Sequence, residues 1–187
     1  MEHMNHKWNN LDCEIVLLLL RGPAHIRGIA ASLQQPPSTV LRRINALVKQ
    51  NVIDFNRQGR NKVFSIRKNI SAKNHVHLSE HYKLAKILIT YPQLGVLIED
   101  ILKTSKNRII LLFGSYAKSI AKPDSDIDIY IDTENKKTKE HIEAINSRIN
   151  VKIGTFDPDN GLIKEIIKNH VILRGVEDYY EKAKLPA

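Results

Sequence analysis

Two aspartates near the middle of the chain have the type and spacing of metal ligands. Asp126 and Asp128 lie in the alternating run DIDIYI, residues 126–131, which predicts a half-buried strand. Side chains alternate across a strand, so both carboxylates are expected on one face and the isoleucines on the other. Neighbouring carboxylates repel each other unless a cation lies between them, and oxygen ligands suit Mg²⁺. The pair therefore predicts a magnesium site.

A second feature precedes the aspartates. The apolar run Ile109 to Phe113 is long enough for one buried strand, and Gly114-Ser115 interrupts it. A basic, polar connection then leads to the aspartate strand. Gly114-Ser115, ten residues, then Asp126-x-Asp128 closely resembles the signature of minimal nucleotidyltransferases, small proteins that carry the catalytic core shared with DNA polymerase β. The flanking segments FGSYAKS and PDSDIDIYI also match, and the similarity covers residues 108–180.

The resemblance implies a nucleotidyltransferase fold and Mg²⁺-dependent transfer of NMP from an NTP to a protein or small-molecule hydroxyl. Gly114 lets the backbone approach a phosphate, and Ser115 offers its amide and hydroxyl at a helix start. Lys118 is expected to neutralise phosphate charge. Asp126 and Asp128 are expected to be catalytic and to hold Mg²⁺ on the triphosphate, in a two-metal site with the ions about 3.5–4 Å apart.

Two positions depart from the family pattern. The family usually has a glycine where Ser119 stands, and it places a third carboxylate on the strand that here includes residues 150–154. Val151 and Ile153 are expected to face the core, so Lys152 is predicted to occupy the place of the third acid. An ammonium there repels a metal, which predicts at most one Mg²⁺ and weak or absent transfer. Alternatively, a bulge in this strand brings Asp157 into the site.

The N-terminal third predicts a different module. Short helices are expected at Asp12–Leu20, His25–Leu33 and Thr39–Gln50, the last with Ser38 as its cap. Strands at 52–56 and 62–66 follow, joined by a basic tip. Three helices and a hairpin resemble the winged helix-turn-helix family over residues 11–68.

The winged-helix resemblance implies binding to double-stranded DNA. The third helix is expected to lie in the major groove and the hairpin, or wing, to contact phosphates. A role as a protein-interaction or dimerisation module is the alternative. A homodimer is expected, because one helix-turn-helix reads only a half-site. The predicted DNA-binding residues are Ser38, Thr39, Arg42, Arg43, Arg57, Arg60 and Lys62.

The charge distribution favours DNA. Residues 1–70 contain 11 Lys and Arg against 4 Asp and Glu, a net charge of +7, whereas residues 71–187 contain 18 against 16, a net charge of +2. The basic character is therefore concentrated in the N-terminal third, where it predicts a polyanionic partner.

The fold class predicted is α+β with two domains. They are a winged helix-turn-helix domain at 1–70 and a nucleotidyltransferase-like α/β domain with a mixed sheet at 108–187, joined by a helical connector at 71–107. The longest apolar run, Ile15 to Leu20, is too short to span a membrane, and the N-terminus lacks a signal-peptide hydrophobic region. The single cysteine, Cys13, fits a reducing compartment, so a cytoplasmic location is expected.

Three functions remain open at this level. The first is a nucleotidyltransferase placed or regulated by DNA binding. The second is a DNA-binding regulator whose transferase-like domain is inactive and senses a nucleotide. The third is an antitoxin, because minimal nucleotidyltransferases often pair with a small helical toxin. The toxin partner is implied by the resemblance alone.

Overall fold

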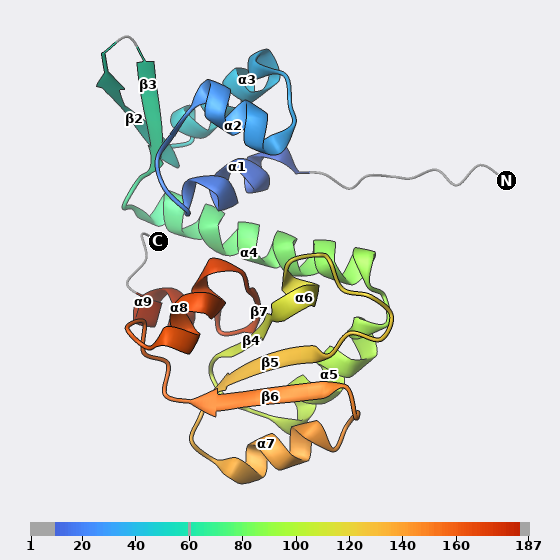
Figure 1. Cartoon of the computed structure of the whole chain (residues 1–187). Helices are drawn as coiled ribbons and strands as arrows, with labels where there is room; N and C mark the ends of the chain where they lie inside the picture. The colour runs from blue at the N-terminus through green and yellow to red at the C-terminus, as the bar shows by residue number, and fades with distance from the viewer. Residues whose placement is uncertain (1–9, 60, 184–187) are drawn as a thin grey trace, which may run out of the picture. The chain divides into compact units, whose positions relative to one another are not determined.

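The computed structural model describes residues 10–59 and 61–183. Contacts divide the chain into two compact units, of which the first ends at Tyr82 and the second begins at Lys83 (Figure 1). Within the described residues, no helix is both long and apolar enough to cross a membrane.

The described part of the first unit contains three short helices, the first part of a fourth helix and a small antiparallel sheet. The order of its strands is β1-β3-β2, with Ala24 paired to Phe64 and Ile53 paired to Ile66. This order of elements is the winged helix-turn-helix arrangement, as predicted. The elements are α1 (Leu11–Leu19), β1 (Ala24–His25), α2 (Ile26–Leu33), α3 (Pro37–Lys49), β2 (Ile53–Gln58), β3 (Asn61–Ile66) and the first part of α4 (Ile70–Thr90).

The helix starts follow local chemistry. Asn10 caps α1, because its side-chain oxygen accepts from the amides of Asp12 and Cys13, at 3.2 and 3.4 Å. The predicted cap of α3, Ser38, is wrong, since Pro37 is already helical and Pro36 holds the cap position. Proline suits the first turn because its fixed φ is helical and its missing N–H would have no partner there.

A single apolar core holds the first unit together. Each of the three helices contributes one face to it, and the start of α4 closes it. The fully buried side chains include Ile15 and Val16 of α1, Ile29 of α2, Val40, Ile44 and Leu47 of α3, and Ala72 and Val76 of α4.

The second unit is built on a four-stranded mixed sheet of order β6-β5-β4-β7. Strands β5 and β6 run parallel, and β4 is antiparallel to both of its neighbours, β5 and β7. The predicted mixed sheet is confirmed. The elements are α5 (Leu94–Thr104), β4 (Ile110–Phe113), α6 (Gly114–Ala117), β5 (Ile127–Asp132), α7 (Lys136–Glu143), β6 (Ile149–Gly154), α8 (Gly161–Lys168), β7 (Val171–Arg174) and α9 (Val176–Ala183).

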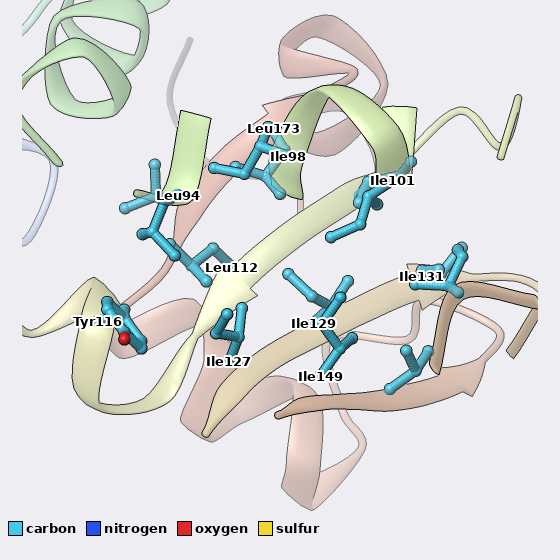
Figure 2. Packing of buried hydrophobic residues seen from close by; sticks show 14 of the residues in the cluster. Leu94, Ile98, Ile101, Leu112, Tyr116, Ile127, Ile129, Ile131, Ile149 and Leu173 are labelled. Carbon is cyan, nitrogen blue, oxygen red and sulfur yellow. The ribbon is translucent and has the colours of Figure 1, made fainter. Parts of the chain in front are cut away.

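One face of this sheet forms the main core of the unit. Ile127, Ile129 and Ile131 of β5 point into it, as the alternating run predicts. Figure 2 shows them facing Leu112 of β4 and the buried side of α5. Burial of the isoleucines thus fixes one face of β5. The side chains between them therefore point to the opposite face.

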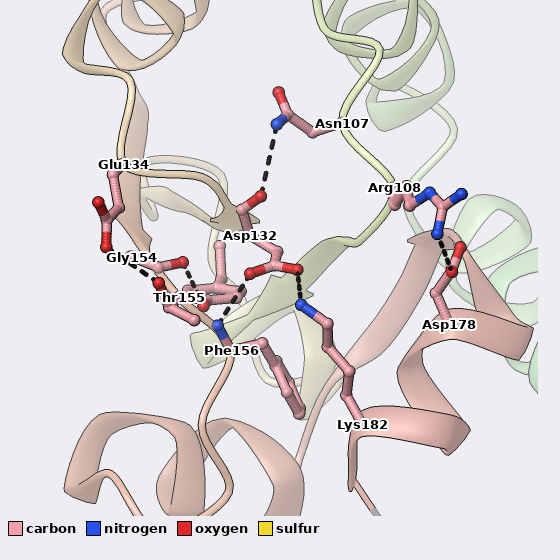
Figure 3. A network of polar contacts seen from close by, with 10 residues as sticks. Asn107, Arg108, Asp132, Glu134, Gly154, Thr155, Phe156, Asp178 and Lys182 are labelled. Carbon is pink, nitrogen blue, oxygen red and sulfur yellow. Dashed lines mark hydrogen bonds and ion pairs between the residues drawn. The ribbon is translucent and has the colours of Figure 1, made fainter.

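The opposite face carries an aromatic and polar layer. The Tyr130 ring contacts Phe156, which contacts Tyr179 of α9. At the C-terminal end of β5, the carboxylate of Asp132 accepts from the Phe156 amide at 2.8 Å and from Lys182 at 2.6 Å (Figure 3). These contacts fasten α9 and the segment after β6 to the sheet, at the far end of β5 from Asp128.

The predicted connector, residues 71–107, is divided between the two units. The unit boundary falls inside α4, and α5 contributes Leu94, Ile98 and Ile101 to the core of the second unit. It stays a prediction that separate domains fold with boundaries at residues 70 and 107.

Candidate functional site

Gly114 and Asp128 meet where β4 turns into α6. Phe113 pairs with Asp128 across the antiparallel strands, and the chain then turns at Gly114 with φ of +71°. A Cβ added to Gly114 would lie 2.1 Å from Oδ2 of Asp128. Only glycine permits both the backbone conformation and this approach. The turn therefore lays the Gly114-Ser115 backbone against the Asp128 carboxylate.

Asn150 holds the other carboxylate oxygen of Asp128. Strands β5 and β6 are parallel, with Asp128 paired to Asn150. The Asn150 side-chain amide donates a hydrogen bond of 2.9 Å to Oδ1 of Asp128. Ile129 and Val151, the next residues, are both fully buried on the other face. Asp128 is thus held between Asn150 and the Gly114 turn.

Lys152 takes a different position from the one predicted. It lies on the same face as Asn150, but it is paired with Tyr130, and its side chain is exposed. Among the described residues no ion pair joins Lys152 to Asp126 or Asp128. The predicted alternation of β6 is confirmed, since Val151 is buried. The residue opposite Asp128 is nevertheless Asn150, two positions before Lys152, and sequence reasoning missed it.

Asp126 and Lys118, two other predicted site residues, are both exposed. Asp126 is exposed and immediately precedes β5. Lys118 is exposed at the end of α6. A hydrogen bond from Lys168 and, more weakly, the charge of Lys118 hold the pKa of Glu165 below its ordinary value. Lys118 therefore lies within electrostatic reach of α8 as well as of the Gly114 turn.

The backbone conformation at Ser119 explains why the family usually has a glycine at this position. Its φ is +58°, in the left-handed region. Glycine adopts this conformation without strain, whereas a residue with a Cβ does so at a cost of about 1–2 kcal/mol. The loop therefore keeps the conformation for which glycine is suited.

Asp157, the acid predicted as the alternative, and Glu165 of α8 have partners other than Asp128. The Asp157 carboxylate accepts from the Asp159 amide, and Glu165 pairs with Lys168 at 2.6 Å. No group of three Asp, Glu, His or Cys side chains able to hold a metal occurs in the described part of the chain. A three-acid site for two ions does not fit these residues.

The exposed face of α3 is the candidate nucleic-acid interface of the first unit. A hollow of about 390 Å³ lies along it. Leu41 is 42% exposed there, among polar and basic neighbours. Sequence reasoning included Ser38 and Arg42 but missed the others, although the helical spacing i, i+4, i+7, i+11 from Ser38 marks Arg42, Asn45 and Lys49 as one stripe. The lining residues are Ser38, Leu41, Arg42, Asn45, Ala46 and Lys49.

Arg43 does not belong to this stripe. Its guanidinium donates two hydrogen bonds to the Asp12 carboxylate, one of them from Nε at 2.7 Å. Successive helix residues lie about 100° apart, so Arg43 is turned toward α1 while Arg42 points outward. Thr39 is half-buried. Arg43 thus joins α1 and α3, and its predicted contact with DNA stays a prediction.

Two of the three cationic side chains predicted on the wing lie within the described residues. Arg57 and Lys62 face each other across β2 and β3, and both are exposed. The Lys62 ammonium lies 4.0 Å from the centre of the Phe55 ring. Arg60, the third predicted phosphate contact, lies outside the described residues.

The geometry agrees with a match to a known family. Residues 97–176 match the family model described as polymerase beta, nucleotidyltransferase. This part of the chain is a nucleotidyltransferase domain. The match begins in α5 and ends at the start of α9, so it contains the Gly114 turn, both aspartates and Asn150. A comparison with curated proteins finds no match.

Solved structures similar to this chain include bacterial regulators. A mutant of ZitR from Lactococcus lactis is 22% identical over 51% of this chain and 65% of its own, with a TM-score of 0.38. The adhesin competence repressor AdcR from Streptococcus pyogenes is 24% identical over 48% and 67%, with a TM-score of 0.39. A homodimeric winged helix-turn-helix DNA-binding domain from Mycobacterium bovis is 17% identical over 44% and 72%, with a TM-score of 0.35.

This chain thus covers less than two thirds of ZitR. The winged-helix assignment rests on the order and pairing of α1 to β3 and not on these likenesses.

Proposed function

We propose that this protein is a DNA-binding regulator whose nucleotidyltransferase domain binds a nucleoside triphosphate. The observation that carries the proposal is the close approach of Gly114 to Asp128. It brings a backbone turn suited to phosphate beside a carboxylate suited to a metal on that phosphate.

The nucleotide is bound through its phosphates. The amide and hydroxyl of Ser115 donate to phosphate oxygens, and Lys118 neutralises part of their charge. Asp126 and Asp128 hold at most one Mg²⁺, which the triphosphate shares. Because three acids are not gathered around Asp128, transfer of the nucleotide is weak or absent.

DNA is bound by the first unit. The stripe on α3 enters the major groove, where Arg42 and Asn45 have the donor geometry for base edges. Arg57 and Lys62 on the wing contact phosphates. The net charge of +7 in residues 1–70 supports this partner. A homodimer reads two half-sites.

The nucleotide claim is tested by isothermal titration of the full chain with each NTP, with and without Mg²⁺. Asp128→Asn is the test variant, because it removes the charge and nearly preserves the shape. We expect micromolar to millimolar binding of at least one NTP and on the order of tenfold weaker binding by the variant. Absence of binding by every NTP contradicts the proposal.

Transfer of NMP to a hydroxyl is the second candidate, and the presence of Asp126 and Asp128 together with Gly114 favours it. Transfer of labelled AMP at a good rate, lost in Asp128→Ala, would establish this activity in place of nucleotide sensing. The antitoxin role rests on the family resemblance alone and stays a prediction.

A further inference from the structure

The register of β5 and β6 fixes Asn150 against Asp128. The flanking pairs, Ile127 with Ile149 and Ile129 with Val151, are buried on the core face. A slip of one residue would bring these apolar side chains to the solvent face, so the core specifies the register strongly. The amide of Asn150 therefore points to the face that carries Asp128, and it donates to Oδ1 at 2.9 Å.

One oxygen of Asp128 accepts a hydrogen bond within the protein, and the other is closely approached by the backbone turn at Gly114. Oδ1 accepts from Asn150, and Oδ2 lies against Gly114, with no room for a side chain between them. A hydrogen bond to an ionised carboxylate is among the stronger kinds. The amide thus supplies at Asp128 part of the stabilisation that a divalent cation would otherwise supply.

An acid at position 150 would reverse this relation. Two carboxylates would then face each other within hydrogen-bond distance, and only a proton or a cation between them would relieve the repulsion. Asparagine and aspartate have nearly the same shape, so the exchange changes the charge at this point of the sheet with little change in packing. Position 150 can therefore determine how strongly the site requires a metal.

We propose that Asn150 is a positioning residue that lets the Asp128 site exist without a bound divalent ion. It holds the carboxylate in place by a hydrogen bond and lowers the affinity of the site for a metal. This inference rests on the proposed function only for the assignment of the site to a nucleotide. Its test uses no nucleotide.

The test is the binding of Mn²⁺ alone to the full chain, followed by the loss of the electron paramagnetic resonance signal of free Mn²⁺. We expect Asn150→Asp to bind Mn²⁺ on the order of tenfold or more tightly than the natural sequence. Added Mn²⁺ should also raise the melting temperature of Asn150→Asp by more than that of the natural chain. Equal affinity in the two proteins overturns the proposal.

Lys152→Asp is the matched control, because it adds an acid to the same face of the same strand, opposite Tyr130. It should show a much smaller gain in Mn²⁺ affinity than Asn150→Asp. An equal gain would mean that the general potential of this face matters and the Asn150 contact does not, which contradicts the proposal.

Asn150→Ala covers the case in which Asn150→Asp does not fold. It removes the amide and adds no charge, so Oδ1 of Asp128 becomes available to a metal. We expect severalfold tighter Mn²⁺ binding than in the natural chain. Unchanged or weaker binding would show that the amide does not compete with the metal, and the proposal would then fail. Absence of NTP binding by the natural chain would contradict the proposed function and leave these results standing.

Discussion

At the scale of single residues, position 114 has the strictest requirement for glycine. Its positive φ and the Asp128 oxygen 2.1 Å from any added Cβ both exclude a side chain. Gly114→Ala should lower the free energy of unfolding by about 2 kcal/mol or more, since the left-handed conformation alone costs about 1–2 kcal/mol. Urea unfolding followed by tyrosine fluorescence measures this, because most tyrosines lie in the second unit.

Gly161→Ala is the control for this substitution. Gly161 begins α8, and a Cβ there meets nothing within 4 Å. It should leave stability unchanged or raise it by about 0.5–1 kcal/mol. Equal loss of stability in the two variants would contradict the steric account of Gly114.

His170 makes a separate prediction about pH. Burial, and secondarily the charge of Lys83, lower the pKa of His170 to about 3, although the imidazole Nδ1 donates to the carbonyls of Ile166 and Ile167. The unfolded chain binds a proton near pH 6.5, so between these pH values it holds more protons than the folded chain. Stability must therefore fall as pH is lowered from 6.5 toward 3, by about 1.4 kcal/mol per pH unit.

Urea unfolding of the second unit at pH 7.5, 6 and 5 measures this slope. His170→Phe removes the titrating group and keeps a ring against Tyr179, so its stability should change less over the same range. His141→Gln, at an exposed position, is the matched control and should keep the natural slope. A slope in His170→Phe equal to that of the natural chain would contradict the prediction.

The residues of the site were partly readable from the sequence. Alternation placed Asp128 and its isoleucine neighbours on the correct faces, because burial of one face fixes the period of a strand. In β6 the same alternation leaves two polar candidates on the open face, Asn150 and Lys152. Which of them lies opposite Asp128 depends on the register between strands, and a single sequence pattern does not contain that information.

At the scale of elements, α3 places two neighbouring arginines on different faces. Arg42 is exposed on the stripe, whereas Arg43 binds Asp12 of α1. Arg42→Ala should weaken binding to a DNA duplex by about 1–3 kcal/mol if it contacts a base, and it should leave stability unchanged. Arg43→Ala should lower stability by about 1 kcal/mol or less, because Arg43 and Asp12 are 40% and 21% exposed.

Fluorescence anisotropy of a labelled duplex and thermal unfolding of each variant distinguish these effects. Loss of DNA affinity in a fully stable Arg43→Ala, with no loss in Arg42→Ala, would contradict the assigned faces of α3.

Most elements follow from local patterns, and the exceptions have tertiary causes. The helices with one apolar face and the strands around Asp128 were expected close to their observed places. Strand β1 has only two residues, and it exists because Ala24 and His25 pair with β3. Strand β6 begins at Ile149, just before the residues 150–154 expected in it, because the pairing of Ile127 with Ile149 extends it. Pairing partners of this kind cannot be read from local propensity.

At the scale of the whole molecule, the chain combines a basic unit of winged-helix architecture with a nucleotidyltransferase domain. The uneven charge was readable from composition, and it predicts salt-dependent binding of DNA by the N-terminal part. The division of α4 between two compact units was not readable, because its helical pattern is continuous from Ile70 to Thr90.

The proposed regulator binds DNA and a nucleotide, and regulation by the nucleotide requires that DNA binding depend on nucleotide binding. If a nucleotide changes the affinity of the protein for DNA by some factor, thermodynamic linkage requires that DNA change the affinity for the nucleotide by the same factor. A coupling of 1–3 kcal/mol, typical of such systems, corresponds to a change of about 5–150-fold.

The most direct test is the affinity of the full chain for a labelled duplex selected by the protein, measured at fixed salt with and without each NTP. We expect at least one NTP to change the affinity about fivefold or more, and Asp128→Asn to lose most of this change while it still binds the duplex. Equal DNA affinity with and without every NTP would contradict the claim.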